Sequence, residues 1–117
     1  MNKKRQEIWN KSNGKCWYCG CDLSEKGWHA DHVKPVIRNW WDGTEQHPEN
    51  EEMNNLVPCC ASCNIQKGNM SVENFRDRIA GFVNSLNEYH TQYAVAKRYG
   101  LLQETNVKVK FWFERRS

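Results

Sequence analysis

The stretch NNLVPCCASCNIQKGN, residues 54–69, joins a short apolar run to a CxxC pair, Cys60 and Cys63. A second CxxC pair, Cys16 and Cys19, lies near the N-terminus. Four thiolates on two tight turns satisfy the tetrahedral coordination of zinc. We therefore predict that Cys16, Cys19, Cys60 and Cys63 hold a structural Zn²⁺ ion. The alternative interpretation is a set of free or redox-active thiols.

The spacing of these cysteines leaves room for further structure between the two pairs. Forty residues separate Cys19 from Cys60, whereas a simple zinc ribbon has about 15–20. Two further cysteines, Cys21 and Cys59, could replace a neighbour as ligands, but we expect both to pack in the core. In a chain of 117 residues, a metal staple adds stability that a small core lacks.

Hydrophobic periodicity and turn signals predict a single domain of the α+β class over residues 1–117. We expect residues 16–70 to form the zinc-stapled core and residues 71–117 a C-terminal extension of helices and a final strand. The expected elements are, in order, a helix over 3–12, a strand over 28–37, a polar loop over 38–53, a strand over 54–60, a short helix from 61 to Gly68, helices over 71–86 and 88–99, and a strand over 107–113 that buries Val107, Val109, Phe111 and Phe113.

The charge distribution is uneven, although the net charge is only +3. Residues 1–15 carry five Lys or Arg against one Glu, and residues 97–117 carry six against two acids. Residues 39–52 hold five acids and no Lys or Arg. Basic ends are typical of a protein that binds a polyanion, and equally of solvated termini.

No stretch approaches about 18 apolar residues, so we expect a soluble, cytoplasmic protein without a membrane partner.

A polar dipeptide, Asp31-His32, lies between the two cysteine pairs within WHADHVKP, residues 28–35. Asn55 follows His32 by 23 residues, and Asn64 follows Asn55 by nine. Imidazole titrates near neutrality and can accept a proton from water. Carboxylate and amide oxygens are hard ligands that suit Mg²⁺ or Mn²⁺. In isolation such a dipeptide is usually an exposed polar pair, and a strand would have to bend or end there for both side chains to reach one site.

Taken together, DHVKP, NNLVPCCASCNIQKGN and the two CxxC pairs resemble the HNH endonuclease family, also called ββα-metal nucleases, in its HNN variant. The resemblance covers residues 16–70 and implies a treble-clef-like ββα-metal core. It implies Asp31 and Asn64 as ligands of a catalytic Mg²⁺ or Mn²⁺ ion. It also implies His32 as general base and Asn55 as the residue that fixes the hairpin loop and orients the base. Asn64 stands where the family's name has His.

From this resemblance we expect a metal-dependent HNH endonuclease that hydrolyses DNA phosphodiester bonds and nicks one strand per active site. Double-stranded DNA is the expected partner, and a homodimer or a larger phage or restriction complex is the expected assembly. Lys67 and Arg38 are candidate contacts to nucleic acid, while Trp40 and Trp41 are expected in the core rather than on DNA. The alternatives are a non-catalytic zinc module that binds nucleic acid or protein, and a structure-selective or RNA-directed nuclease of the same fold.

Overall fold

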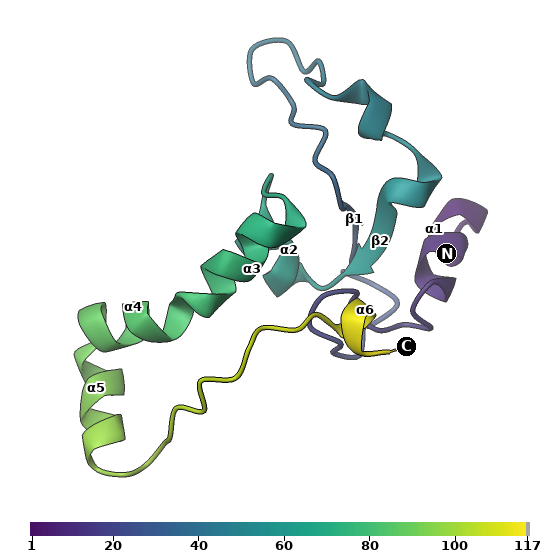
Figure 1. Ribbon diagram of the computed structural model, residues 1–117. Helices are drawn as coiled ribbons and strands as arrows, with labels where there is room; N and C mark the ends of the chain where they lie inside the picture. The colour runs from purple at the N-terminus through teal and green to yellow at the C-terminus, as the bar shows by residue number, and fades with distance from the viewer. Residues whose placement is uncertain (117) are drawn as a thin grey trace.

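The protein combines helices with one two-stranded antiparallel sheet, as Figure 1 shows for the computed structural model. The structure describes residues 1–116. The predicted mixture of helices and strands is confirmed. In chain order the elements are α1 (Lys3–Asn10), β1 (His29–His32), the 3-10 turns η1 (Pro48–Asn50) and η2 (Met53–Asn55), β2 (Leu56–Cys59), α2 (Ala61–Lys67), α3 (Val72–Ala80), α4 (Phe82–Tyr89), α5 (Thr91–Arg98) and α6 (Trp112–Arg115).

The sheet pairs β1 with β2 in antiparallel register, with Asp31 opposite Val57. Every residue of β2 is buried. Leu56 packs with Ile8 of α1, whereas Val57 belongs to the core that contains Tyr18. Successive side chains of a strand point to opposite faces, so this short strand joins two hydrophobic clusters and holds α1 against the sheet.

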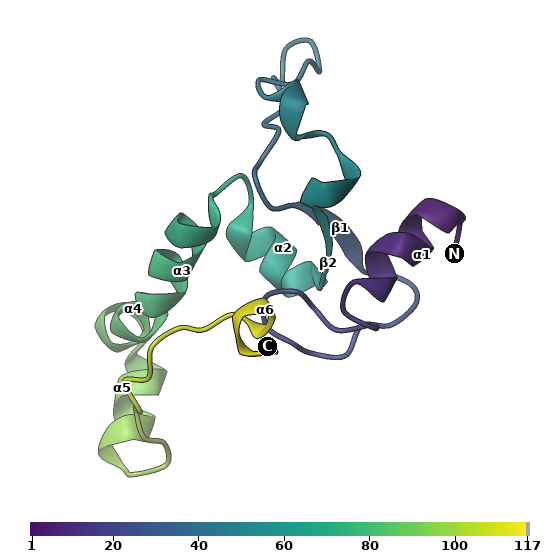
Figure 2. The same ribbon diagram turned by 45° about the vertical axis from the view of Figure 1, so that its right-hand side comes forward.

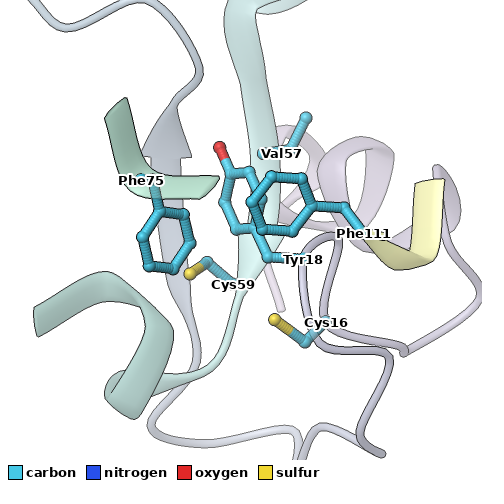
Figure 3. Close-up of a cluster of buried hydrophobic side chains, with 6 residues drawn as sticks. All are labelled: Cys16, Tyr18, Val57, Cys59, Phe75 and Phe111. Atoms are coloured by element: carbon cyan, nitrogen blue, oxygen red, sulfur yellow. The ribbon is translucent and has the colours of Figure 1, made fainter. Parts of the chain in front are cut away.

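The main core is an aromatic cluster around Tyr18, whose ring meets Phe75 and Phe111 edge-on at centroid distances of 5.5 Å (Figure 3). Phe75 and Phe111 stack on each other at 5.4 Å. Phe75 comes from α3, and Phe111 directly precedes α6. The cluster therefore ties the C-terminal extension to the cysteine-bearing turn that precedes β1.

Helices α3, α4 and α5 form an arm that leads away from the sheet before the chain returns to it at α6 (Figure 1 and Figure 2). Ser71 caps α3, and its hydroxyl accepts a hydrogen bond from the amide of Asn74 at 3.1 Å. The single helix predicted over 71–86 is wrong, because the chain breaks into α3 and α4 at Gly81, and glycine is a poor helix former.

The molecule is elongated, with extents of 50 × 35 × 25 Å. Within residues 1–116, no helix has both the length and the apolar character needed to cross a membrane.

The prediction of a final strand over 107–113 is also wrong. Residues 102–111 run without regular structure, and none of the described residues adds a third strand to the sheet. The backbone near Phe111 bonds elsewhere, since the amide of Trp112 donates to the carbonyl oxygen of Tyr18 at 2.8 Å. The alternating pattern correctly marks Phe111 as buried but is wrong for Val107, which is 77% exposed. A strand also needs a partner for its amides and carbonyls.

Candidate metal centre and active site

Cys16, Cys19, Cys60 and Cys63 come together at the start of α2. Their Sγ atoms all lie within 4.8 Å of one another, and the Sγ atoms of Cys19 and Cys60 are 3.8 Å apart. A tetrahedral site with Zn–S bonds of about 2.3 Å requires sulfur separations of about 3.8 Å. The four cysteines are therefore positioned to hold a metal ion, as predicted.

Backbone amides support both turns of the cysteine cluster. Cys60 is the N-cap of α2, and its Sγ accepts a hydrogen bond from the amide of Cys63 at 3.3 Å. The amide of Cys60 donates to the Sγ of Cys16 at 3.4 Å. In the first pair, Gly20 has φ +78°, and a Cβ there would lie 2.7 Å from Trp112. Glycine therefore permits both the left-handed backbone of the turn and the close approach of α6.

The thiols of the cluster cannot all ionise together without a compensating cation. Hydrogen bonds with the Cys59 and Cys63 side chains hold the pKa of Cys16 far below its usual range. The pKa of Cys63 is raised by its hydrogen bond with Cys16 and then by burial. Since like charges at these distances disfavour one another, a metal ion held here would supply the positive charge that four thiolates need.

The two further cysteines have different environments. Cys59 is buried in the aromatic core, as predicted. Cys21 is exposed, so the prediction that it packs in the core is wrong. Its carbonyl oxygen accepts a hydrogen bond from the amide of Cys16 at 2.9 Å. The backbone of Cys21 therefore closes the first metal-binding turn while its side chain remains at the surface.

The second feature of interest is an open hollow of about 350 Å³ between β1, the loop that follows it and α2. Asp31 and His32 line the hollow from β1, Arg38 from the loop and Asn64 from α2. Both members of the dipeptide reach one site, and β1 ends at His32. Asn64 directly follows Cys63, so the cluster that holds the start of α2 also holds Asn64 at the hollow.

Asp31 is buried, and its Oδ2 atom has two partners. The hydroxyl of Tyr18 donates to it at 2.7 Å, and the Nζ atom of Lys67 lies 3.2 Å from it. Burial, followed by the charge of Asp31, raises the pKa of Tyr18 far above its usual range, so the phenol remains a hydrogen-bond donor. The Tyr18 hydroxyl points away from the sulfur atoms of Cys16 and Cys59 (Figure 3). One aromatic side chain thus connects the core to the hollow.

The prediction that Lys67 contacts nucleic acid is wrong. Its side chain is 0% exposed, and Nζ donates to the carbonyl oxygen of His32 at 2.9 Å in addition to pairing with Asp31. A phosphate group cannot reach an ammonium group that is enclosed in this way. Lys67 instead neutralises a buried carboxylate and holds the end of β1.

Glu51 contacts His32, and the sequence did not reveal this contact. The side chain of His32 is 22% exposed, and its Nε2 atom lies 2.7 Å from the Oε1 atom of Glu51. This hydrogen bond is the main cause of a lowered pKa for Glu51. The available signal was the acidic run of residues 39–52, but no local pattern links that run to the histidine.

Asn55 is buried and holds two parts of the loop together. Its Oδ1 atom accepts a hydrogen bond from the amide of Lys34 at 2.9 Å, and its Nδ2 atom donates to the carbonyl oxygens of Lys34 and Asn50, both at 2.8 Å. These contacts join the segment after His32 to the segment before Glu51. Asn55 therefore fixes the loop through hydrogen bonds with the backbone.

The same loop carries three large side chains that are mostly exposed to solvent. Arg38 is 61% exposed and lies 3.4 Å from Glu45 and 3.6 Å from Glu51. Trp40 and Trp41 are 91% and 63% exposed and contact each other edge-on. The prediction that these tryptophans pack in the core is wrong, because the loop closes on itself through backbone hydrogen bonds and projects away from the sheet (Figure 1).

Comparison of the chain with protein-family models gives no match, and comparison with curated proteins gives none either. The resemblance to HNH endonucleases therefore rests on the motifs alone. The structure adds a separate observation, which is that Asp31, His32 and Asn64 line one hollow.

Proposed function

We propose that the chain is a zinc-stapled, metal-dependent endonuclease of the HNH type that nicks DNA. The observation that supports this function is the meeting of Asp31, His32 and Asn64 at one open hollow, although they belong to two different elements. A carboxylate and an amide that can hold a cation, next to an imidazole that can accept a proton, are the parts needed for metal-assisted hydrolysis. A module that only binds a partner has no need of this combination.

The oxygen atoms at the hollow fit a hard divalent cation. Asp31 uses Oδ2 for Tyr18 and Lys67, which leaves Oδ1 for a ligand, and Asn64 offers its side-chain carbonyl oxygen. Such donors suit Mg²⁺ or Mn²⁺, with water and phosphate oxygens completing the coordination. When bound there, the ion would stabilise the negative charge that develops on the phosphate.

His32 is the proposed general base. Its neutral imidazole takes a proton from a water molecule, and the oxygen of that water attacks the phosphorus atom. The P–O bond to the leaving sugar oxygen breaks, and this oxygen takes a proton from solvent. General-base catalysis of this kind contributes typically about 10²–10⁴-fold to the rate. Arg38, on the exposed loop beside the hollow, is proposed to contact a neighbouring phosphate group.

Zinc is the metal that we propose for the cysteine cluster. Four sulfur ligands with a separation such as the 3.8 Å between Cys19 and Cys60 suit tetrahedral Zn²⁺. All four coordination positions are then filled by protein atoms, which is typical of a structural site rather than a catalytic one. The ion would anchor the start of α2 and, with it, Asn64.

Nicking of supercoiled plasmid tests the proposed function. The zinc-loaded protein is expected to produce open-circular DNA when Mg²⁺ or Mn²⁺ is added and to leave the plasmid intact without it. His32→Ala is expected to lower the nicking rate at least about 10²-fold, with unchanged zinc content and thermal stability. His90→Ala is the matched control, because His90 is exposed and lies in the arm between α4 and α5.

Three outcomes separate the candidate functions. Full activity of His32→Ala would contradict the proposed mechanism. DNA binding without cleavage, and without dependence on the added cation, would favour the non-catalytic zinc module. Parallel assays on duplex, branched and single-stranded DNA and on RNA distinguish a duplex-DNA nuclease from a structure-selective or RNA-directed one.

A further inference from the structure

Glu51 forms a hydrogen-bonded pair with His32, one of the residues that line the hollow. His32 is the last residue of β1, and Glu51 directly follows η1. The Nε2 atom of His32 lies 2.7 Å from the Oε1 atom of Glu51. The two side chains are 22% and 38% exposed, so the contact is partly shielded from water.

The chemistry of this contact decides which nitrogen of His32 is basic. An ionised carboxylate accepts hydrogen bonds and donates none, so Nε2 has to carry the hydrogen. A neutral imidazole carries one such hydrogen, which leaves Nδ1 as the nitrogen that can accept a proton. Glu51 is the ionised partner near neutral pH, since its pKa is lowered by the hydrogen bonds with His32 and Glu45.

Other groups hold the Glu51 carboxylate in place. Its Oε2 atom lies 3.6 Å from the guanidinium group of Arg38, which also lies 3.4 Å from Glu45. A hydrogen bond with Glu51 is the main cause of a raised pKa for Glu45. The positive charge of Arg38, which contacts both acids, offsets the repulsion between their carboxylates.

Asn55 connects the two partners through the backbone. Its Nδ2 atom donates to the carbonyl oxygen of Asn50, which precedes Glu51, and to that of Lys34, which follows His32 by two residues. One amide side chain therefore sets how far the segment that carries the acid lies from the end of β1.

We propose that Glu51 is a positioning residue that orients the His32 imidazole through Nε2 and leaves Nδ1 as the general base. The proposal rests on the proposed function, because it takes His32 as the base. As the proton passes from water to Nδ1, the carboxylate of Glu51 stabilises the imidazolium that forms. The contacts of Arg38, Glu45 and Asn55 keep that carboxylate in place.

Variants of Glu51 test the proposal by kinetics. Glu51→Ala should lower the kcat for plasmid nicking about 10- to 100-fold with little change in KM, a smaller loss than that caused by His32→Ala. Glu51→Gln keeps an accepting oxygen but no charge, so it should recover part of the loss. Glu49→Ala is the matched control, since Glu49 is 66% exposed and contacts His47 instead. It should leave kcat unchanged.

Nitrogen-15 NMR of the zinc-loaded protein, without Mg²⁺ or Mn²⁺, provides a readout that does not depend on cleavage. The His32 signals, assigned by their loss in His32→Ala, should show the Nε2–H tautomer in the wild type and in Glu51→Gln, and a mixture of tautomers in Glu51→Ala. An unchanged tautomer or an unchanged kcat in Glu51→Ala would overturn the proposal. If His32→Ala remains active, the nuclease mechanism fails, yet the tautomer comparison still decides whether Glu51 orients His32.

Discussion

Replacing Lys67 by methionine removes a buried ammonium group that two oxygen atoms share. The Lys67 side chain is 0% exposed, and its Nζ atom lies 3.2 Å from the Oδ2 atom of Asp31 and 2.9 Å from the carbonyl oxygen of His32. Methionine has a similar length, so the substitution changes the packing little. Its main effect is that the Asp31 carboxylate loses its counter-charge and the His32 carbonyl oxygen loses its hydrogen-bond donor. Removing one partner of a buried ion pair typically lowers the free energy of unfolding by about 3–5 kcal/mol.

The expected change in thermal stability follows from the size of the domain. For a chain of this length, 1 kcal/mol shifts the unfolding midpoint by roughly 4 °C, so Lys67→Met should lower Tm by roughly 12–20 °C. Lys97→Met is the matched control. Lys97 lies 3.0 Å from Glu104 but is 41% exposed, so solvent replaces the contact and the shift should be small. Calorimetry measures the Tm shifts of both variants. The zinc concentration is kept constant, because bound metal itself stabilises the folded state.

A second substitution separates charge from packing in this prediction. Asp31→Asn, combined with Lys67→Met, removes the uncompensated charge and should recover part of the lost stability. The reasoning is refuted if Lys67→Met lowers Tm no more than Lys97→Met does. That result would mean that the Lys67 ammonium is accessible to solvent, and Lys67 would again be a candidate contact to a phosphate group.

Three further substitutions have expected outcomes. Cys63→Ser should reduce the zinc content measured by atomic emission and lower Tm, while an unchanged zinc content would contradict the proposed ligand set. Asn55→Ala removes three hydrogen bonds with Lys34 and Asn50, each worth about 0.5–1.5 kcal/mol, so urea unfolding should show a loss of about 1.5–4.5 kcal/mol. A smaller loss would argue against its loop-fixing role. Trp40→Ala should leave Tm unchanged, since the indole is 91% exposed, and a clear decrease would show that the indole packs against the loop.

Each half of the cysteine cluster could be predicted because the geometry of a CxxC pair is local. Each CxxC pair places two sulfur atoms on one turn, and Cys60 caps α2 through a contact with Cys63 only three residues away. The cap of α3 at Ser71 was predictable for the same reason, since a side chain that bonds to an amide three residues later leaves a sequence signature.

Two of the incorrect predictions depend on the tertiary structure. Alternating residues over 107–113 carry no information on whether another strand lies beside them, and here the amide of Trp112 bonds to Tyr18 instead. Trp40 was expected in the core rather than on DNA, but it lies exposed on a loop that closes through its own hydrogen bonds. Local composition cannot decide either outcome, because both depend on which segments meet.

The sequence by itself identified the four cysteines as candidate metal ligands, because two thiols at CxxC spacing lie on one turn and can bind the same ion. It offered Asp31, His32 and Asn64 as candidate site residues only through the resemblance to HNH endonucleases. Only the tertiary structure decided that Glu51 contacts His32 and that Lys67 is enclosed beside Asp31. The physical reason is that burial and ion pairing depend on distances between segments. In this protein those distances are set by the sheet register, by Asn55 and by the aromatic core, and none of them can be read from neighbouring residues alone.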